Sequence, residues 1–174
     1  MYIGHVGVAL AAKRVRMSIG LLVLLVATYA PDWIDTGLCA VGGYDERQML
    51  SHSIPVVVAV AVIALTVYTA FTRDLTGGLV VAAVIFSHMV LDWVTGRKPT
   101  WPGGTEIGLN LYSSPVADFF AEGLVIAAGA LLYARTLPPR RRPWVDLSIM
   151  LGALLTLQLT IDVAHLLFKS LPKC

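Results

Sequence analysis

The sequence predicts an all-α integral membrane protein: a helical bundle of about five transmembrane helices with an N-terminal half-helix or re-entrant segment. Hydrophobic residues make up 57% of the 174 residues, and the mean hydropathy is +0.76. Charged residues make up only 14%, against about 25% in soluble domains. Apolar stretches long enough to cross a bilayer recur along the chain. The length suits one domain, so residues 1–174 are treated as a single transmembrane domain.

Five stretches have the length and composition of transmembrane helices. They cover residues 18–38, 54–72, 77–95, 116–135 and 145–168. Turn-forming residues separate them, including Gly77-Gly78 before the third span and Pro138-Pro139 before the fifth. Residues 1–12 are also apolar, but at about 1.5 Å per residue a helix of this length reaches only half-way across the membrane. We therefore expect a half-helix packed against the bundle, or a re-entrant segment.

The basic residues predict the orientation of the bundle. One side of the membrane receives eight of them, Lys13, Arg14, Arg16, Arg73, Arg135, Arg140, Arg141 and Arg142. The other side receives five, Arg47, Arg97, Lys98, Lys169 and Lys173. Cytoplasmic loops carry an excess of basic residues, so the first side is predicted to be cytoplasmic. The net charge of +2 comes from small clusters, which argues against a nucleic-acid partner. Cys39 and Cys174 match no metal or disulfide spacing.

Ionisable residues within or beside the spans gather near the opposite, non-cytoplasmic side. Nine share this level: Asp32, Asp35, His52, His88, Asp92, Asp118, Glu122, Asp162 and His165. A charged group in hydrocarbon costs at least about 2.5 kcal/mol, so such residues face the bundle interior and usually serve function. His88 and Asp92 are four residues apart and therefore share a helix face. Imidazole with carboxylate suits zinc, and also manganese or iron.

Each of these residues also has a structural interpretation. His88 and Asp92 can form an ordinary hydrogen-bonded pair, and Asp32 and Asp35 can cap a turn at Pro31. His52 can begin a helix, and His5 can be a core histidine bonded to a backbone carbonyl. The loop 96–114, with Trp101, can anchor the bundle at the interface or contact a substrate. The concentration of nine polar positions at one level favours a shared site.

Several motifs resemble those of bacterial and archaeal inner-membrane proteins known as membrane-bound metal-dependent hydrolases. They are GHVGVALAAK, APDWID, LSHSIP, SHMVLDWVTGRK, WPGG and GLNLY. The resemblance covers roughly residues 1–135 and leaves the final span outside. It implies a hydrolytic activity and a metal. Carried onto this chain, it points to five ligands, His5, Asp32, His52, His88 and Asp92.

One stretch departs from the pattern of that family. Many relatives place a histidine-arginine pair shortly before the SHS-like element, whereas this chain reads YDERQML. Arg47 is therefore present without the histidine. One ligand or acid–base group is missing here, or Asp45 or Glu46 replaces it.

These observations predict a membrane-embedded metal-dependent hydrolase acting on a membrane lipid, a lipid-linked substrate or another interfacial substrate, with a phosphoester as the first candidate. Zinc is the expected metal, with manganese or magnesium as alternatives. Glu122 or Asp35 is expected to act as general base or to orient a ligand histidine. Arg97, Lys98 and Arg47 are expected to bind an anionic headgroup. The alternatives are a cation or proton transporter built on the same cluster, and a non-catalytic membrane protein with a structural metal site. In every case the chain belongs in the cytoplasmic membrane, with the site on the non-cytoplasmic side.

Overall fold

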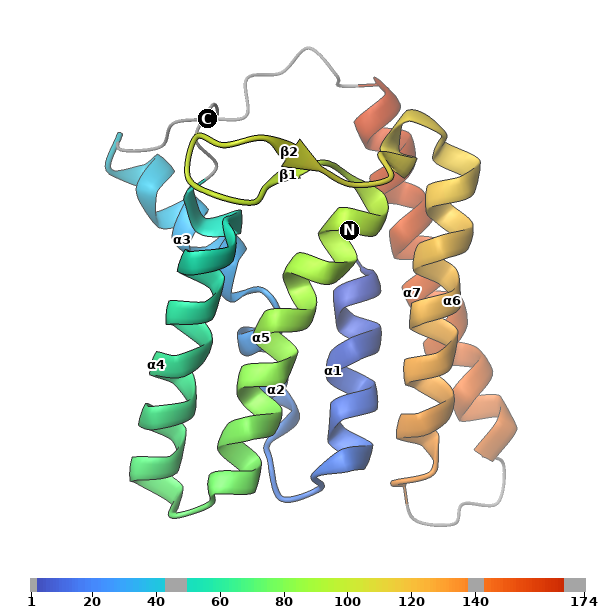
Figure 1. Ribbon diagram of the computed structural model, residues 1–174. Helices are drawn as coiled ribbons and strands as arrows, with labels where there is room; N and C mark the ends of the chain where they lie inside the picture. Colours follow the sequence, from blue (N-terminus) through green and yellow to red (C-terminus); the bar gives the residue numbers. More distant parts are fainter. Residues whose placement is uncertain (1–2, 43–49, 138–142, 168–174) are drawn as a thin grey trace.

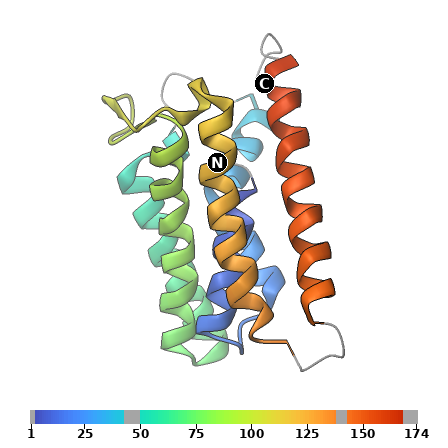
Figure 2. The ribbon, with the colours of Figure 1, turned by 90° about the vertical axis from the view of Figure 1, so that its right-hand side faces the viewer.

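The computed structural model describes residues 3–42, 50–137 and 143–167, and it confirms an all-α bundle (Figure 1). Four helices are long and apolar enough to cross a membrane: α4 (Ile54–Thr72), α5 (Leu75–Thr95), α6 (Pro115–Ala134) and α7 (Pro143–Leu167). They correspond to the second to fifth predicted spans. α7 lies at the edge of the bundle, beside α6 (Figure 2).

The first predicted span, residues 18–38, is not one straight helix. It consists of α2 (Leu21–Thr28) and α3 (Ala30–Ala40), which are bent by 60° relative to each other. Pro31 occupies the first turn of α3. It has no N–H to donate to the preceding turn, so the α-helical hydrogen bonds of α2 cannot continue through it. The pair is a broken span or a re-entrant loop, and α3 leaves the direction of α2 inside the bundle.

The predicted half-helix is present as α1 (Gly4–Val15). Its 12 residues span about 18 Å. α1 packs mainly on α6 and also contacts α2 and α5. Two glycines allow the approach to α6: a Cβ at Gly129 would lie 2.7 Å from the Gly7 Cα, and a Cβ at Gly7 would lie 2.9 Å from the Ile126 Cα. The two backbones touch at a separation that no larger side chain permits.

At the predicted cytoplasmic end, Asp74 joins the turn before α5 to the turn after α1. Its Oδ1 accepts the backbone N–H of Gly77 at 2.9 Å, and Arg16 Nη2 lies 3.0 Å from its Oδ2. The Gly77 hydrogen bond lowers the pKa of the Asp74 carboxyl, burial opposes the shift, and Arg16 adds to it. Asp74 thus caps α5 in its charged form.

At the opposite end, the loop after α5 forms a short antiparallel hairpin of β1 (Lys98–Pro99) and β2 (Glu106–Ile107). The short helical turns η1 (Leu50–His52) and η2 (Leu111–Ser113) lie on either side of it along the chain. The Ile54 N–H donates to the Thr100 carbonyl at 3.2 Å, and the Leu109 N–H donates to the Trp93 carbonyl at 2.7 Å. The hairpin is therefore fixed to the ends of both α4 and α5.

Candidate metal centre

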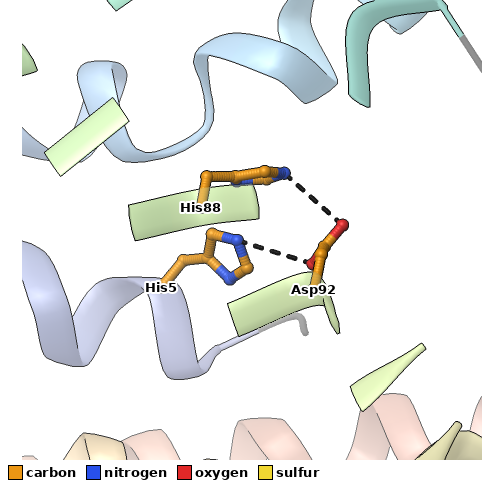
Figure 3. Close-up of side chains that lie close together, drawn as sticks. All are labelled: His5, His88 and Asp92. Carbon is orange, nitrogen blue, oxygen red and sulfur yellow. Dashed lines mark ion pairs between the residues drawn. The ribbon is translucent and has the colours of Figure 1, made fainter. Parts of the chain in front are cut away.

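Five polar residues from four separate elements meet inside the bundle. His5 comes from α1, Asp32 from α3, His52 from η1, and His88 and Asp92 from α5. His88 is thirteen residues from the start of α5 and seven from its end, which places it about 20 Å from one end and about 10 Å from the other. The centre therefore lies below the end of α5 that is predicted to be non-cytoplasmic. It combines two triads that share His88: His5, His88 and Asp92 (Figure 3), and Asp32, His52 and His88.

The two histidine nitrogens of this centre and each aspartate oxygen beside them are spaced as ligands of a small metal ion are. The Nε2 atoms of His52 and His88 are 3.2 Å apart. Asp32 Oδ1 lies 3.3 Å from the first and 3.6 Å from the second. Asp92 Oδ2 lies 3.4 Å and 3.7 Å from the same two atoms. In a tetrahedral zinc site with bonds of about 2.0–2.2 Å, neighbouring donors are about 3.3–3.6 Å apart.

The outer partners of the two histidines fix which ring nitrogen faces the centre. His88 Nδ1 lies 2.8 Å from the Thr28 carbonyl oxygen, which can only accept, so Nδ1 carries the proton. His52 Nδ1 lies 3.1 Å from Asp35 Oδ2, and Ser51 donates to the other oxygen of Asp35. Both histidines thus direct an unprotonated Nε2 at the centre when neutral, as a metal ligand must.

The electrostatics of the centre are dominated by lone pairs of histidine nitrogens and carboxylate oxygens that point at one another. When both histidines are neutral, their Nε2 atoms face the oxygens of Asp32 and Asp92 without a hydrogen between them. The Lys98 ammonium approaches from β1, 3.3 Å from Asp92 Oδ2. Burial lowers the pKa of His52, but its hydrogen bonds to Asp32 and Asp35 outweigh this and raise the pKa above its usual value. The arrangement attracts a cation, either a proton or a metal ion.

His5 completes the centre from the side of α1. Its side chain is fully buried, and neither ring nitrogen has a hydrogen-bond partner among the described residues. Nε2 lies 3.7 Å from Asp92 Oδ1, the oxygen that does not face His52. The ring is edge-on to His88, with centroids 4.0 Å apart, and stacks on Tyr29. A buried imidazole whose nitrogens lack hydrogen bonds lowers the stability of the fold. His5 is therefore a candidate ligand of a bound ion.

A second polar cluster, formed by Asp118, Glu122, Gln158 and Asp162, holds the first turn of α1. Glu122 Oε2 accepts the Gly4 N–H at 3.0 Å, and Gln158 Oε1 accepts the Ile3 N–H at 3.1 Å. Gln158 in turn donates to Asp162 Oδ1 at 2.7 Å. These acceptors satisfy amides that a helix start leaves unpaired. Because Gly4 precedes His5, the second cluster sets the position of a residue in the metal centre.

The remaining predicted site residues fall in three places. Asp35 lies behind His52, on the side away from His88. Arg97 is exposed, next to the inward-reaching Lys98. Arg47, Asp45 and Glu46 lie outside the described residues, as does the stretch that departs from the family pattern.

Sequence reasoning did not identify Gln158 as part of the site. It also did not identify the ion pair between Lys98 and Asp92. Gln158 was visible only as a lone amide in an apolar helix, in the stretch LLTLQLTID. The expectation for the cysteines was wrong: Cys39, near the end of α3, is disulfide-bonded. Spacing rules detect local cysteine patterns, whereas this bond depends on the tertiary fold.

Comparison with known proteins identifies the family but no solved relative. No curated protein and no solved structure matches the chain. The model of a family described as YdjM inner membrane protein matches residues 1–166. The match includes most of α7, which the motif resemblance had left outside. The chain therefore belongs to the YdjM family of inner membrane proteins.

Proposed function

We propose that this protein is a metal-dependent hydrolase that acts on an anionic ester at the membrane interface. The observation that carries the proposal is the convergence of the Nε2 atoms of His52 and His88 on oxygens of Asp32 and Asp92, at 3.2–3.7 Å. Unprotonated nitrogens and carboxylates packed this closely in a buried site need a cation between them. Asp32 Oδ1 and Asp92 Oδ2 each lie 3.3–3.7 Å from the two nitrogens, as ligands of a divalent ion do.

Zinc is the proposed metal. Imidazole together with carboxylate suits zinc, while magnesium prefers oxygen ligands and keeps several waters. Manganese tolerates the same donors and is the alternative. When bound, zinc supplies a Lewis acid and lowers the pKa of a bound water from 15.7 to about 7. His5 and the second oxygen of Asp92 offer donors for a further ion, so the metal stoichiometry decides whether His5 binds the same ion or another.

The surrounding residues suit positioning and charge recognition. Asp35 and Thr28 orient His52 and His88 through their Nδ1 atoms. Glu122, fully buried and bonded to Gly4, positions His5 and has no open path to a substrate. Lys98 is the cation next to the centre, and its side chain is 20% exposed. We assign to Lys98 the binding of an anionic oxygen, such as that of a phosphoester, with Arg97 at the rim.

The site is proposed to face the periplasm. The predicted cytoplasmic side carries the larger number of basic residues. Cys39 lies in α3, which also carries Asp32 and Asp35, and it is disulfide-bonded. Disulfides persist in the periplasm and are rare in the cytosol. Both observations support the same orientation.

Metal analysis of the purified protein tests the proposal. Mass spectrometry of the wild type in detergent is expected to find bound zinc or manganese, at one or two ions per chain. Asp92→Asn and His88→Ala should lose it. Glu106→Gln, the same carboxylate-to-amide change on the exposed hairpin, should retain it.

Activity is then measured on a chromogenic phosphodiester and on phospholipids, before and after chelation and metal return. Turnover that disappears with the metal and returns with it is the expected result. A protein that binds no metal after reconstitution with zinc, manganese or magnesium would refute the proposal of a metal-dependent hydrolase. The cluster would then be tested for proton or cation transport in vesicles. Metal binding without turnover, together with loss of folding in Asp92→Asn, would instead indicate a structural metal site.

A further inference from the structure

A wide apolar groove lies on the outer surface of the bundle between α2, α3, α4 and α5. Its volume is about 920 Å³, within the range of about 300–1,000 Å³ typical of ligand sites. Of its sixteen lining residues only Trp33, Tyr68 and Thr72 carry a polar side-chain atom. Several lining side chains are well exposed, among them Ile63 at 61% and Phe71 at 87%. The groove therefore faces the hydrocarbon of the membrane.

The break in the first hydrophobic span creates this groove. α2 ends at Thr28 after eight residues, about 12 Å of helix. α3 then departs at 60°, so the direction of α2 is not continued alongside α4. Ala30, Trp33 and Ile34 of α3 line the groove. Figure 1 shows α3 at the upper end of α2, beside the top of α4.

The same short helix also carries ligands of the metal centre. Asp32 and Asp35 extend from α3 to His52, while their neighbours Trp33 and Ile34 line the groove. Consecutive Cα atoms are about 3.8 Å apart. Asp32 is also the most open of the ligands, with its side chain 45% exposed, against 5% or less for its partners in the centre. The centre therefore opens next to the helix that borders the groove.

The dimensions of the groove suit a hydrocarbon chain. On α4 the lining runs from Val60 to Thr72, a distance of about 18 Å. Half of a bilayer's hydrocarbon core is about 15 Å. Val60 lies six residues, about 9 Å, from the start of α4, close to the depth of His88 on the neighbouring α5. A chain whose headgroup lies at the depth of the metal centre therefore enters the groove past Trp33 and follows α4 towards Thr72.

We propose that the groove binds the hydrocarbon chain of a lipid whose anionic headgroup lies at the Asp32 side of the metal centre, near Lys98. The substrate is then an anionic lipid or a lipid-linked ester rather than a water-soluble one. The headgroup half of this inference rests on the proposed function, whereas the chain-binding half does not. A second copy of the protein is a less suitable occupant, because a helix packed here would cover the entrance beside Asp32.

A photoactivatable lipid tests chain binding directly. The probe is a phosphatidylethanolamine with a diazirine in the middle of one acyl chain, incorporated with the protein into nanodiscs and mapped by mass spectrometry. Adducts are expected on Ile63 and Ala64 several-fold more often than on Leu124, a 72% exposed residue on α6. Ala64→Trp fills the groove and should abolish the enrichment. Ala128→Trp, on an exposed part of α6, is the matched control and should leave it unchanged.

The two proposals fail separately in this experiment, because the metal content is measured on the same preparations. Enriched adducts in a protein that binds no metal would retain the lipid groove and remove the hydrolase. Bound metal with adducts spread evenly over the lipid-facing surface would refute the lipid groove and leave the proposed metal-dependent function in place. Protein-to-protein cross-links at Ile63, in place of lipid adducts, would overturn the inference and assign the groove to a contact between copies.

Discussion

Replacement of Glu122 tests whether the second polar cluster controls the metal centre. Glu122 accepts the Gly4 N–H at 3.0 Å and is fully buried. Glu122→Ala removes this hydrogen bond, worth about 0.5–1.5 kcal/mol, and leaves a buried amide unpaired, which costs about 1–3 kcal/mol. The first turn of α1 then frays, and His5 is displaced because it is adjacent to Gly4 in the chain.

The magnitude can be stated for metal binding. Loss of a partner that orients a metal ligand typically weakens metal affinity by about 10–100-fold, and we expect the zinc affinity of Glu122→Ala to fall within this range. Glu122→Gln keeps an acceptor of nearly the same shape, so its loss should be clearly smaller. The assay is a zinc titration against a competing chelator, with the thermal unfolding of the metal-free proteins measured in parallel.

Two results would refute this reasoning. The first is a Glu122→Ala protein that binds zinc as tightly as the wild type, because the fixed position of His5 would then be irrelevant to the metal. The second is an equal loss in the Gln and Ala variants, because the negative charge of Glu122, rather than its hydrogen bond to α1, would then be responsible.

Three further predictions concern packing, pH and substrate. Gly129→Ala should destabilise the bundle by about 1–3 kcal/mol through overpacking against α1. Gly152→Ala, with nothing within 4 Å of the added Cβ, should be neutral or slightly stabilising. The thermal unfolding temperatures of the two variants test this difference. Asp74→Asn should be less stable than the wild type at pH 7. Because the folded-state pKa of Asp74 is lowered, its contribution to the free energy of unfolding is present above the usual aspartate pKa and disappears as the pH falls through the lowered value. The stabilities of the two proteins should therefore converge in acid. A difference that stays constant with pH would contradict the assignment. Lys98→Ala should raise the KM for an anionic ester while leaving the bound metal in place; an unchanged KM would remove Lys98 from substrate binding.

The membrane-spanning helices were predictable from the sequence because hydropathy measures the property that inserts them. α4 begins and ends at the predicted residues, and α1 has the predicted half-length. The break at Tyr29 was not predicted, since the run of apolar residues continues through it and hydropathy does not register the N–H that Pro31 lacks. A boundary set by one missing hydrogen bond needs backbone chemistry in addition to apolarity.

The candidate site was predictable in its members but not in its connections. His88 and Asp92 follow from their spacing on one helix, and their approach to His52 follows from their common level in the membrane. The roles of Glu122 and Gln158 depend on backbone amides of α1, which lie 118 and 155 residues away in the chain. No side-chain pattern encodes such a partner, because every residue except proline has the same amide.

The short first helix has a consequence for the order in which the protein assembles. α1 leaves the ribosome before α6 and α7, yet it is too short to span the membrane alone, and the amides of Ile3 and Gly4 at its start are accepted by side chains of α7 and α6. His5 therefore reaches its place beside Asp92 only after the last helices have inserted. α1 is made before the helices on which it docks, so the full set of candidate metal ligands comes together only after α6 and α7 are in place. A product that lacks α6 or α7 contains His5 but not the acceptors that hold the first turn of α1 in place.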